Sequence, residues 1–248
     1  MRKWITIISI VVISVTAKAS DHSNLEEELP TDLTDAYPIS YLGREFETIF
    51  RYQKDGTDSF EMINKLKFGW PRNMELSVRA PSIIDQIDKE GYGDTTLEAF
   101  WNFNQETLSL PAFALSGSAE LPTGTDDDDD GYDPAIKLAI SKLIGQSELY
   151  HSVHLNLEYQ FNDNRETEER NGRYKAIFGY SRRLNNETMF VTDFVREQLM
   201  DEEDEINLLE LGLRYQLTPF SVVSAGAGYG ISDQSPDFRV VAGVQLSF

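Results

Sequence analysis

Ser152, His154 and Asn156 are the residues whose types and spacing come closest to a catalytic group. A spacing of two places all three side chains on one face of an extended strand. A serine nucleophile needs a histidine base within hydrogen-bond reach, and strand neighbours two apart are separated by roughly 7 Å, at about 3.3 Å per residue. Side chains could bridge this distance in a hydrolase. We favour the other interpretation, in which the three residues line a polar pore.

An acidic run at residues 126–130 offers the oxygen ligands that Ca²⁺ or Mg²⁺ prefers. The run lacks the spaced glycine and terminal glutamate of an EF-hand loop, and adjacent like charges are normally solvated. We therefore expect a solvated loop and no cofactor, with Asp126, Asp128 and Asp130 as the alternative metal ligands. The sequence contains no cysteine, so thiol chemistry and disulfides are both absent.

Charged residues of both signs alternate with apolar residues along most of the chain. Such charges could pair across a narrow barrel and hold its wall in shape, or they could form a selectivity ladder for a passing solute. The candidates for the lining of a pore are Arg51, Lys65, Lys67, Arg79, Glu98, His154, Asn156, Glu158, Arg173, Lys175, Glu210, Arg214 and Arg239.

Extended segments are needed to position these side chains, and the chain supplies twelve of them after residue 43. Most are long enough for a tilted strand to cross a membrane, which takes about 9–11 residues. The register of the ninth is ambiguous because both of its faces carry apolar residues. The segments are 44–54, 57–70, 73–80, 94–103, 108–121, 134–144, 149–161, 173–183, 187–199, 206–217, 220–231 and 238–248.

The connections between these segments alternate in length. Those after even-numbered segments are short, such as 184–186 and 218–219, whereas those after odd-numbered segments are mostly long and polar, such as 122–133 and 162–172. The exception is the two-residue hairpin signal Asp55-Gly56. Short periplasmic turns and long external loops are typical of outer-membrane barrels. The sequence predicts an all-β fold, a closed antiparallel transmembrane β-barrel of about 12 strands with both termini in the periplasm.

Both ends of the chain fit an exported protein. Residues 1–19 read as a signal peptide, because Arg2 and Lys3 precede an apolar stretch and Ala17-Lys18-Ala19 offers a cleavage site. Removal of this segment would leave 19 basic against 42 acidic residues, a net charge of −23 that excludes nucleic acid as a partner. Residues 20–43 read as a periplasmic lead-in or partial plug, and residues 44–248 as the barrel.

Short motifs in the barrel resemble the outer-membrane transporter family named for the meta-pathway of phenol degradation. The resemblance rests on 91–94 (Gly-Tyr-Gly-Asp), 121–124 (Leu-Pro-Thr-Gly), Asp55-Gly56 and the C-terminal Phe248. It implies an outer-membrane channel for small, often aromatic or hydrophobic compounds, and it implies no catalytic residues. The terminal Phe248 also resembles the signal by which the barrel assembly machinery recognises its substrates.

A passive channel for small molecules is therefore the predicted function, and we expect no enzyme activity. An outer-membrane lipid hydrolase and a non-transporting structural barrel are the alternatives. Twelve strands lie between the packed interiors of eight-stranded barrels and the open channels of sixteen, which predicts a narrow, partly occluded path. The expected partners are outer-membrane lipid and lipopolysaccharide, the assembly machinery and a small solute.

Overall fold

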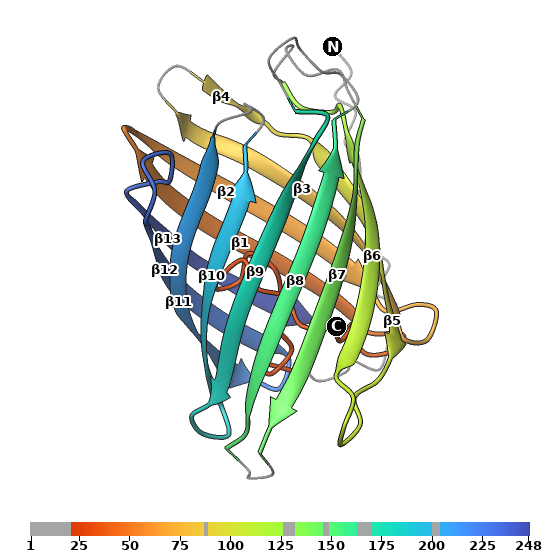
Figure 1. Ribbon diagram of the computed structural model, residues 1–248. Helices are drawn as coiled ribbons and strands as arrows, with labels where there is room; N and C mark the ends of the chain where they lie inside the picture. The colour runs from red at the N-terminus through yellow and green to blue at the C-terminus, as the bar shows by residue number, and fades with distance from the viewer. Residues whose placement is uncertain (1–20, 87–88, 126–131, 146–148, 163–169, 200–203) are drawn as a thin grey trace, which may run out of the picture.

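A closed barrel of twelve long antiparallel strands forms most of the protein (Figure 1). The computed structural model describes residues 21–86, 89–125, 132–145, 149–162, 170–199 and 204–248. Strand β1 pairs with β13 as well as with β2, which closes the ring. The predicted all-β fold is confirmed. The strands are β1 (Arg44–Asp55), β2 (Thr57–Phe68), β3 (Met74–Gln86), β5 (Thr95–Asn104), β6 (Ala112–Leu121), β7 (Asp133–Ile144), β8 (His151–Phe161), β9 (Gly172–Arg183), β10 (Thr188–Gln198), β11 (Glu205–Thr218), β12 (Ser221–Gly230) and β13 (Phe238–Ser247), with a short β4 (Lys89–Tyr92) that pairs with β3.

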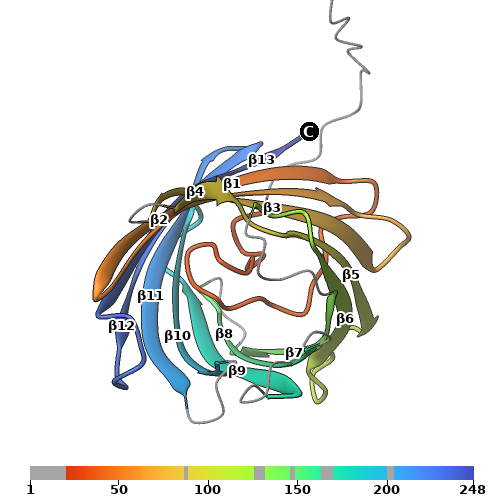
Figure 2. The ribbon, with the colours of Figure 1, turned by 90° about the horizontal axis from the view of Figure 1, so that it is seen from above.

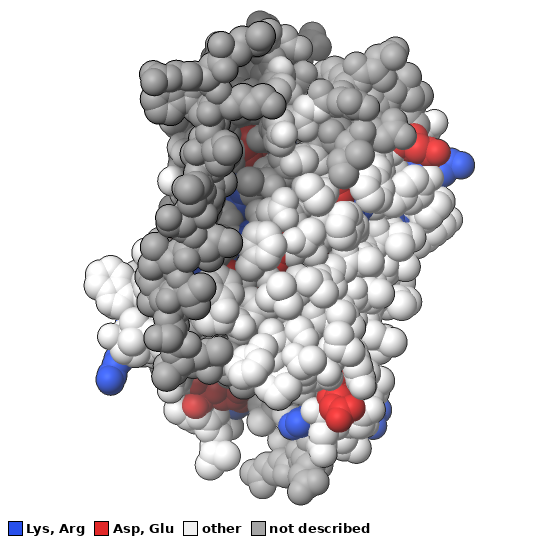
Figure 3. Space-filling model, turned by 180° about the vertical axis from the view of Figure 1, so that it is seen from behind, with Lys and Arg blue, Asp and Glu red and all other residues white. Residues whose placement is uncertain are grey.

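Apolar residues on the outside and polar residues on the inside alternate along these strands. In β11, Leu209, Leu211 and Leu213 are about half exposed, whereas the intervening Glu210 and the following Arg214 are buried. This pattern is the reverse of a water-soluble protein and is typical of a barrel whose outer surface contacts lipid. Figure 3 shows the result on one face, where uncharged atoms cover most of the middle and charged side chains gather towards the ends. Among the described residues, no helix is long and apolar enough to cross a bilayer.

The connections divide the barrel into two unlike ends. At one end, which we call the turn end, strands are joined by segments 69–73, 105–111, 145–150, 184–187 and 219–220. At the other, the loop end, the connections include 122–132, 162–171 and 231–237, besides the tight hairpin at Gly56. The predicted alternation of connection length holds only in part, because residues 105–111 form a longer turn than the sequence suggested and the loop-end connections at Gly56 and 199–204 are short.

Two predicted boundaries were wrong. Strand β3 continues to Gln86 and pairs with β4, so most of the loop expected at 81–93 is a hairpin. The sequence pattern ends this strand before Pro81, but a proline fits a strand wherever its missing N–H is not needed by the ladder. Strand β6 begins at Ala112 rather than at Leu108, whose side chain is 91% exposed in the preceding turn.

The interior of the barrel is filled in part by residues 21–43, which precede β1 (Figure 2). We call residues 25–33 the anchor loop and residues 34–39 the strap. Their presence explains the ambiguous register of β10, whose Met189, Val191 and Val195 point inward and pack against Leu25 and Leu33. An apolar inner face is thus a contact surface for the chain's own N-terminal segment.

Candidate functional site

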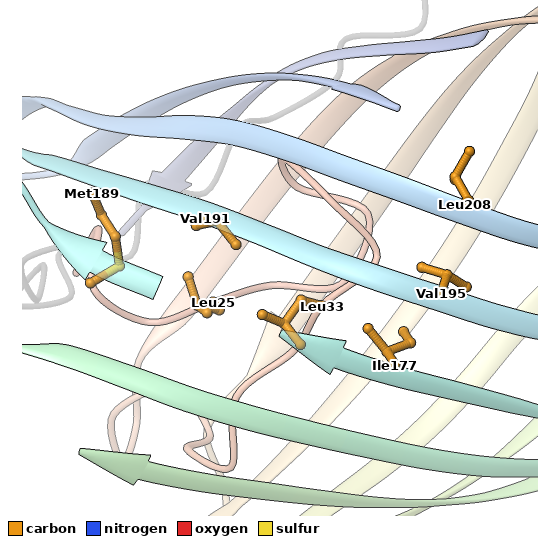
Figure 4. Packing of buried hydrophobic residues seen from close by; sticks show 7 residues of the cluster. All are labelled: Leu25, Leu33, Ile177, Met189, Val191, Val195 and Leu208. Carbon is orange, nitrogen blue, oxygen red and sulfur yellow. The ribbon is translucent and has the colours of Figure 1, made fainter. Parts of the chain in front are cut away.

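The anchor loop packs its leucines into apolar patches of the barrel wall. Leu25 and Leu33 lie among side chains of β9, β10 and β11 (Figure 4). Leu29 is fully buried with Ile49 and Ile63 on the neighbouring part of the wall. Burying a leucine contributes roughly 1.5–3 kcal/mol, so these three side chains provide a large share of the affinity of the loop for the wall.

Glycines in the wall make room for this loop. A Cβ atom at Gly179 would collide with the side chain of Leu33, and one at Gly212 would lie 2.5 Å from Cγ of Pro30. A Cβ at Gly226 would meet the carbonyl oxygen of Pro30. A glycine on a strand often marks such a close backbone approach. Gly179 of β9, Gly212 of β11 and Gly226 of β12 therefore shape a complementary surface for the loop.

Arg214 binds the backbone of the N-terminal segment. Its guanidinium is fully buried and donates to the carbonyl oxygens of His22 (3.1 Å) and Leu29 (2.8 Å) and to Oε1 of Gln245 (2.6 Å). An arginine presents five donors in a fixed fork, which here connects β11, β13 and the segment.

Carboxylates at the outer tip of the anchor loop pair with bases of the wall. Glu28 lies 3.1 Å from Arg51, 3.2 Å from Lys65 and 2.8 Å from Arg79. Burial alone would raise the pKa of Glu28, but these three cations outweigh it and hold the pKa well below its ordinary value. Glu28 is therefore ionised and central to the attachment of the loop.

The neighbouring carboxylates of the loop extend this network. Asp32 lies 3.0 Å from Lys175 and 3.1 Å from Arg239, and Glu27 lies 2.7 Å from Lys137. The same balance of burial against cationic neighbours lowers the pKa of Asp32. Three carboxylates thus join the loop to strands on opposite sides of the barrel.

The strap is held differently, by uncharged side chains that bond its backbone. Asn156 accepts from the N–H of Thr34 (3.0 Å) and donates to its carbonyl oxygen (2.9 Å). Ser141 Oγ accepts from the N–H of Ala36, and Asn102 Nδ2 donates to the carbonyl oxygen of Ala36 (2.9 and 2.7 Å). These side chains provide the backbone hydrogen bonds that a neighbouring strand would provide in a sheet. Carboxylates contribute as well: Glu75 accepts from the N–H of Ile39 (3.0 Å), Asp35 from the N–H of Tyr37 (2.9 Å) and Glu106 from the hydroxyl of Tyr37 (2.9 Å).

His154 supports the strap rather than a nucleophile. Its ring nitrogens bond Ser141 Oγ (2.8 Å) and Ser181 Oγ (2.9 Å), so neither is directed at Ser152. A catalytic histidine is normally oriented by a third group such as a carboxylate. In the part of the chain that the structure describes, no carboxylate bonds this ring. The arrangement is that of a structural hydrogen-bond network.

The candidate lining residues all lie on the inner face of the barrel, and most bond the N-terminal segment. Glu98 pairs instead with Lys137 (3.1 Å), and Arg173 bonds Gln160. The residues that bond the segment directly are Arg51, Lys65, Lys67, Arg79, Asn156, Lys175, Glu210, Arg214 and Arg239.

Sequence reasoning missed the partners of this network. Lys137, Asn102 and Ser141 occupy inward positions of their strands, so the alternation with outward apolar residues could have identified them. The carboxylates of the anchor loop offered no such signal, because residues 20–43 follow no period.

Two large cavities lie inside the described part of the barrel, one on each side of the strap, and a smaller one of about 20 Å³ borders Thr34 and Tyr37 of the strap. The outer cavity, of about 200 Å³, lies towards the loop end and is lined by Lys137, Glu158 and other side chains of β2 to β8. The inner cavity, of about 440 Å³, lies towards the turn end and is lined by Ser141, His154 and Glu106 among others. The strap residues Asp35 and Tyr37 line the inner cavity.

Carboxylates that could bind a metal meet in one place among the described residues. Ligand atoms of Glu26, Glu45 and Glu47 lie within 4.8 Å of one another. The ammonium group of Lys67 occupies this place, since it bonds Glu26 and lies 3.3 Å from Oε1 of Glu47. The cluster is therefore already neutralised in part by a cation. Asp126, Asp128 and Asp130 lie outside the described residues.

Comparison with known proteins assigns the chain to a family. The model of the family described as "Putative MetA-pathway of phenol degradation" matches residues 46–248. The chain belongs to this family. A search of the curated proteins finds no match.

Solved structures share the fold of this family member at low sequence identity. An outer membrane channel from Pseudomonas putida F1 superimposes with a TM-score of 0.70 at 14% identity, covering 88% of this chain and 100% of its own. The NanC porin superimposes with a TM-score of 0.60 at 13% identity, covering 82% and 98%. The KdgM porin gives 0.58 at 13% identity, covering 82% and 99%. The fold is therefore that of outer-membrane barrel channels.

Proposed function

We propose that the protein is a passive channel of the outer membrane, closed at rest by its N-terminal segment. The observation that carries the proposal is the pair of cavities inside the barrel, separated by a segment whose backbone is bonded by side chains of the wall. A barrel with a purely structural role needs no such cavities, because charges in a narrow barrel can pair across it.

The orientation proposed for the barrel follows from its connections. Short turns face the periplasm in outer-membrane barrels, which places the turn end, the start of β1 and Phe248 on that side. Residues 1–19 would then act as the signal peptide. The N-terminal segment would enter the barrel from the periplasm after cleavage.

The solutes proposed for this channel are small and polar. Carboxylates, lysines and hydroxyl groups dominate the outer cavity, and the inner cavity adds Asp21, Asp35 and Glu106. A hydrophobic compound would lose little water on entering and would leave these groups without solvation. This proposal departs from the hydrophobic compounds that the family resemblance implies.

Planar-bilayer recording tests the channel function. The mature chain should show low and intermittent conductance, and a variant lacking residues 21–43 should show a steady, larger one. Heat-modifiable migration on a gel checks that both proteins are folded barrels. A folded barrel without the segment that conducts nothing would contradict the proposal and would favour a structural role.

A further inference from the structure

Two strands run from one cavity to the other and show how thin the barrier between them is. In β7, the inward residue Lys137 lines the outer cavity, Ala139 packs beside Ala36 of the strap, and Ser141 lines the inner cavity. In β8, Glu158, Asn156 and His154 follow the same order. Ala139 and Asn156 are register partners. On each strand, a single inward residue thus lies between the two cavities. Successive inward residues of a strand are about 7 Å apart.

Both cavities carry an excess of carboxyl groups. Six line the outer cavity, against the three bases Lys65, Arg79 and Lys137. Four line the inner cavity, and no lysine or arginine is among its described lining residues. A cleft lined by one sign of charge raises the local concentration of the opposite ion.

Four further bases of the inner wall bind the N-terminal segment. Arg51, Lys175, Arg214 and Arg239 border neither cavity, and each bonds a group of residues 22–32. The bases of the outer cavity, Lys65, Arg79 and Lys137, also pair with the anchor loop, so carboxyl groups remain in excess in both cavities.

We propose that small cations cross the barrel along β7 and β8 through the two cavities, and that the strap moves aside while the anchor loop stays bound. This inference rests on the proposed channel function. It names the class of solute and the part of the segment that opens.

The kinds of bond in the two parts support this division. The strap is bonded chiefly by the amides and hydroxyl of Asn102, Asn156 and Ser141, whose hydrogen bonds water can replace at little net cost. The anchor loop is held by buried ion pairs, and breaking one leaves an uncompensated buried charge. The two parts are joined at Asp35, which accepts from the N–H of Leu25 (2.9 Å) and donates its own N–H to the carbonyl oxygen of Leu25 (3.3 Å), so movement of the strap must break these two bonds as well.

Reversal potentials in a KCl gradient test the solute class on the full mature chain. We expect K⁺ to permeate at least about fivefold better than Cl⁻, since an acidic cleft concentrates cations. Glu158→Gln combined with Glu120→Gln should lower this preference. The matched control is Glu197→Gln, which removes an inner carboxylate that lines neither cavity. A preference for Cl⁻, or an equal effect of the control, would overturn the inference.

Open probability tests which part of the segment moves. The double variant Asn102→Ala/Asn156→Ala should raise it about tenfold, the effect of roughly 1.4 kcal/mol of lost hydrogen bonding. Leu29→Ala weakens the attachment of the anchor loop instead and should leave the open probability within about twofold of wild type. This is expected even though loss of the buried leucine costs more free energy than loss of the hydrogen bonds. If Leu29→Ala opens the channel more than the double variant, the whole segment leaves the barrel and the inference fails. Absence of current even without residues 21–43 would instead contradict the channel function itself.

Discussion

The anchor loop and the strap are consecutive parts of one segment, yet the barrel holds them by different means. The loop combines buried leucines with ion pairs to Arg51, Lys175 and Arg239. The strap buries two apolar side chains, Ala36 and Ile39, and has backbone hydrogen bonds to mostly neutral side chains. Breaking a buried ion pair costs about 3–5 kcal/mol, against about 1 kcal/mol for a neutral hydrogen bond. A single segment can therefore stay attached at one part while the other part opens.

Replacing Glu28 should have the largest effect on this difference. Glu28→Gln leaves Arg51, Lys65 and Arg79 without their shared carboxylate, so we expect about 3–5 kcal/mol less stability for the docked loop. Hydrogen exchange measures this on the amide of Asp32, which donates to Glu210 (2.9 Å). An unchanged exchange rate at Asp32 would show that the ion pairs contribute nothing to docking.

The two parts should respond to pH in opposite directions. The pKa of Glu28 is lowered, so the stability it provides is present above its ordinary pKa of 4.5 and is lost as the pH falls below that value. Burial raises the pKa of Asp35 in the strap to about 7, against backbone N–H groups of Leu25 and Tyr37 and the charge of Arg214, with Asp21 adding to the rise. Its contribution is complete below pH 3.8 and is lost as the pH rises through 7.

Hydrogen exchange at several pH values measures this contrast, after correction for the intrinsic pH dependence of exchange. Acid should increase the exchange rate of the Asp32 amide, whereas the change from pH 6 to pH 8 should increase that of the Ala36 amide. Parallel behaviour of the two amides would show that the segment opens as one unit.

The barrel could be predicted from the sequence because lipid imposes a simple pattern. Leu209, Leu211 and Leu213 face lipid and Glu210 faces inward, and this alternation repeats in nearly every strand. The boundaries failed at Pro81 and Leu108, where pairing beyond the membrane depends on tertiary contacts rather than on alternation.

The interior could not be predicted in the same way. Wall residues such as Lys175 were identified as inward-facing, but their partner Asp32 lies in a segment without periodicity. Ser152, His154 and Asn156 share a face as expected, while the bonds of His154 go to Ser141 and Ser181 on other strands. Contacts between distant parts of the chain, which the spacing of residues does not encode, decide these roles.

A glycine of the wall gives an intermediate effect on the anchor loop. Gly226→Ala would place a Cβ against the carbonyl oxygen of Pro30 and 3.1 Å from that of Leu211, so we expect a loss of about 1–3 kcal/mol from overpacking. Gly117→Ala is the matched control, since a Cβ there meets nothing within 4 Å. Urea unfolding in lipid vesicles and exchange at Asp32 measure the two variants. Equal behaviour would contradict the close fit between wall and loop.

The smallest effect should come from a single hydroxyl that holds the strap. Ser141→Ala removes the acceptor for the N–H of Ala36 and a partner of His154, and we expect about 1 kcal/mol less protection of that amide. Exchange at Asp32 should stay at its wild-type rate, because the anchor loop does not contact Ser141. Ser77→Ala, which changes a hydroxyl residue lining the outer cavity, is the control. If Ser141→Ala increased the exchange rate of the Asp32 amide as much as that of the Ala36 amide, the strap and the anchor loop would open together. Cations could then cross only when the whole segment leaves the barrel.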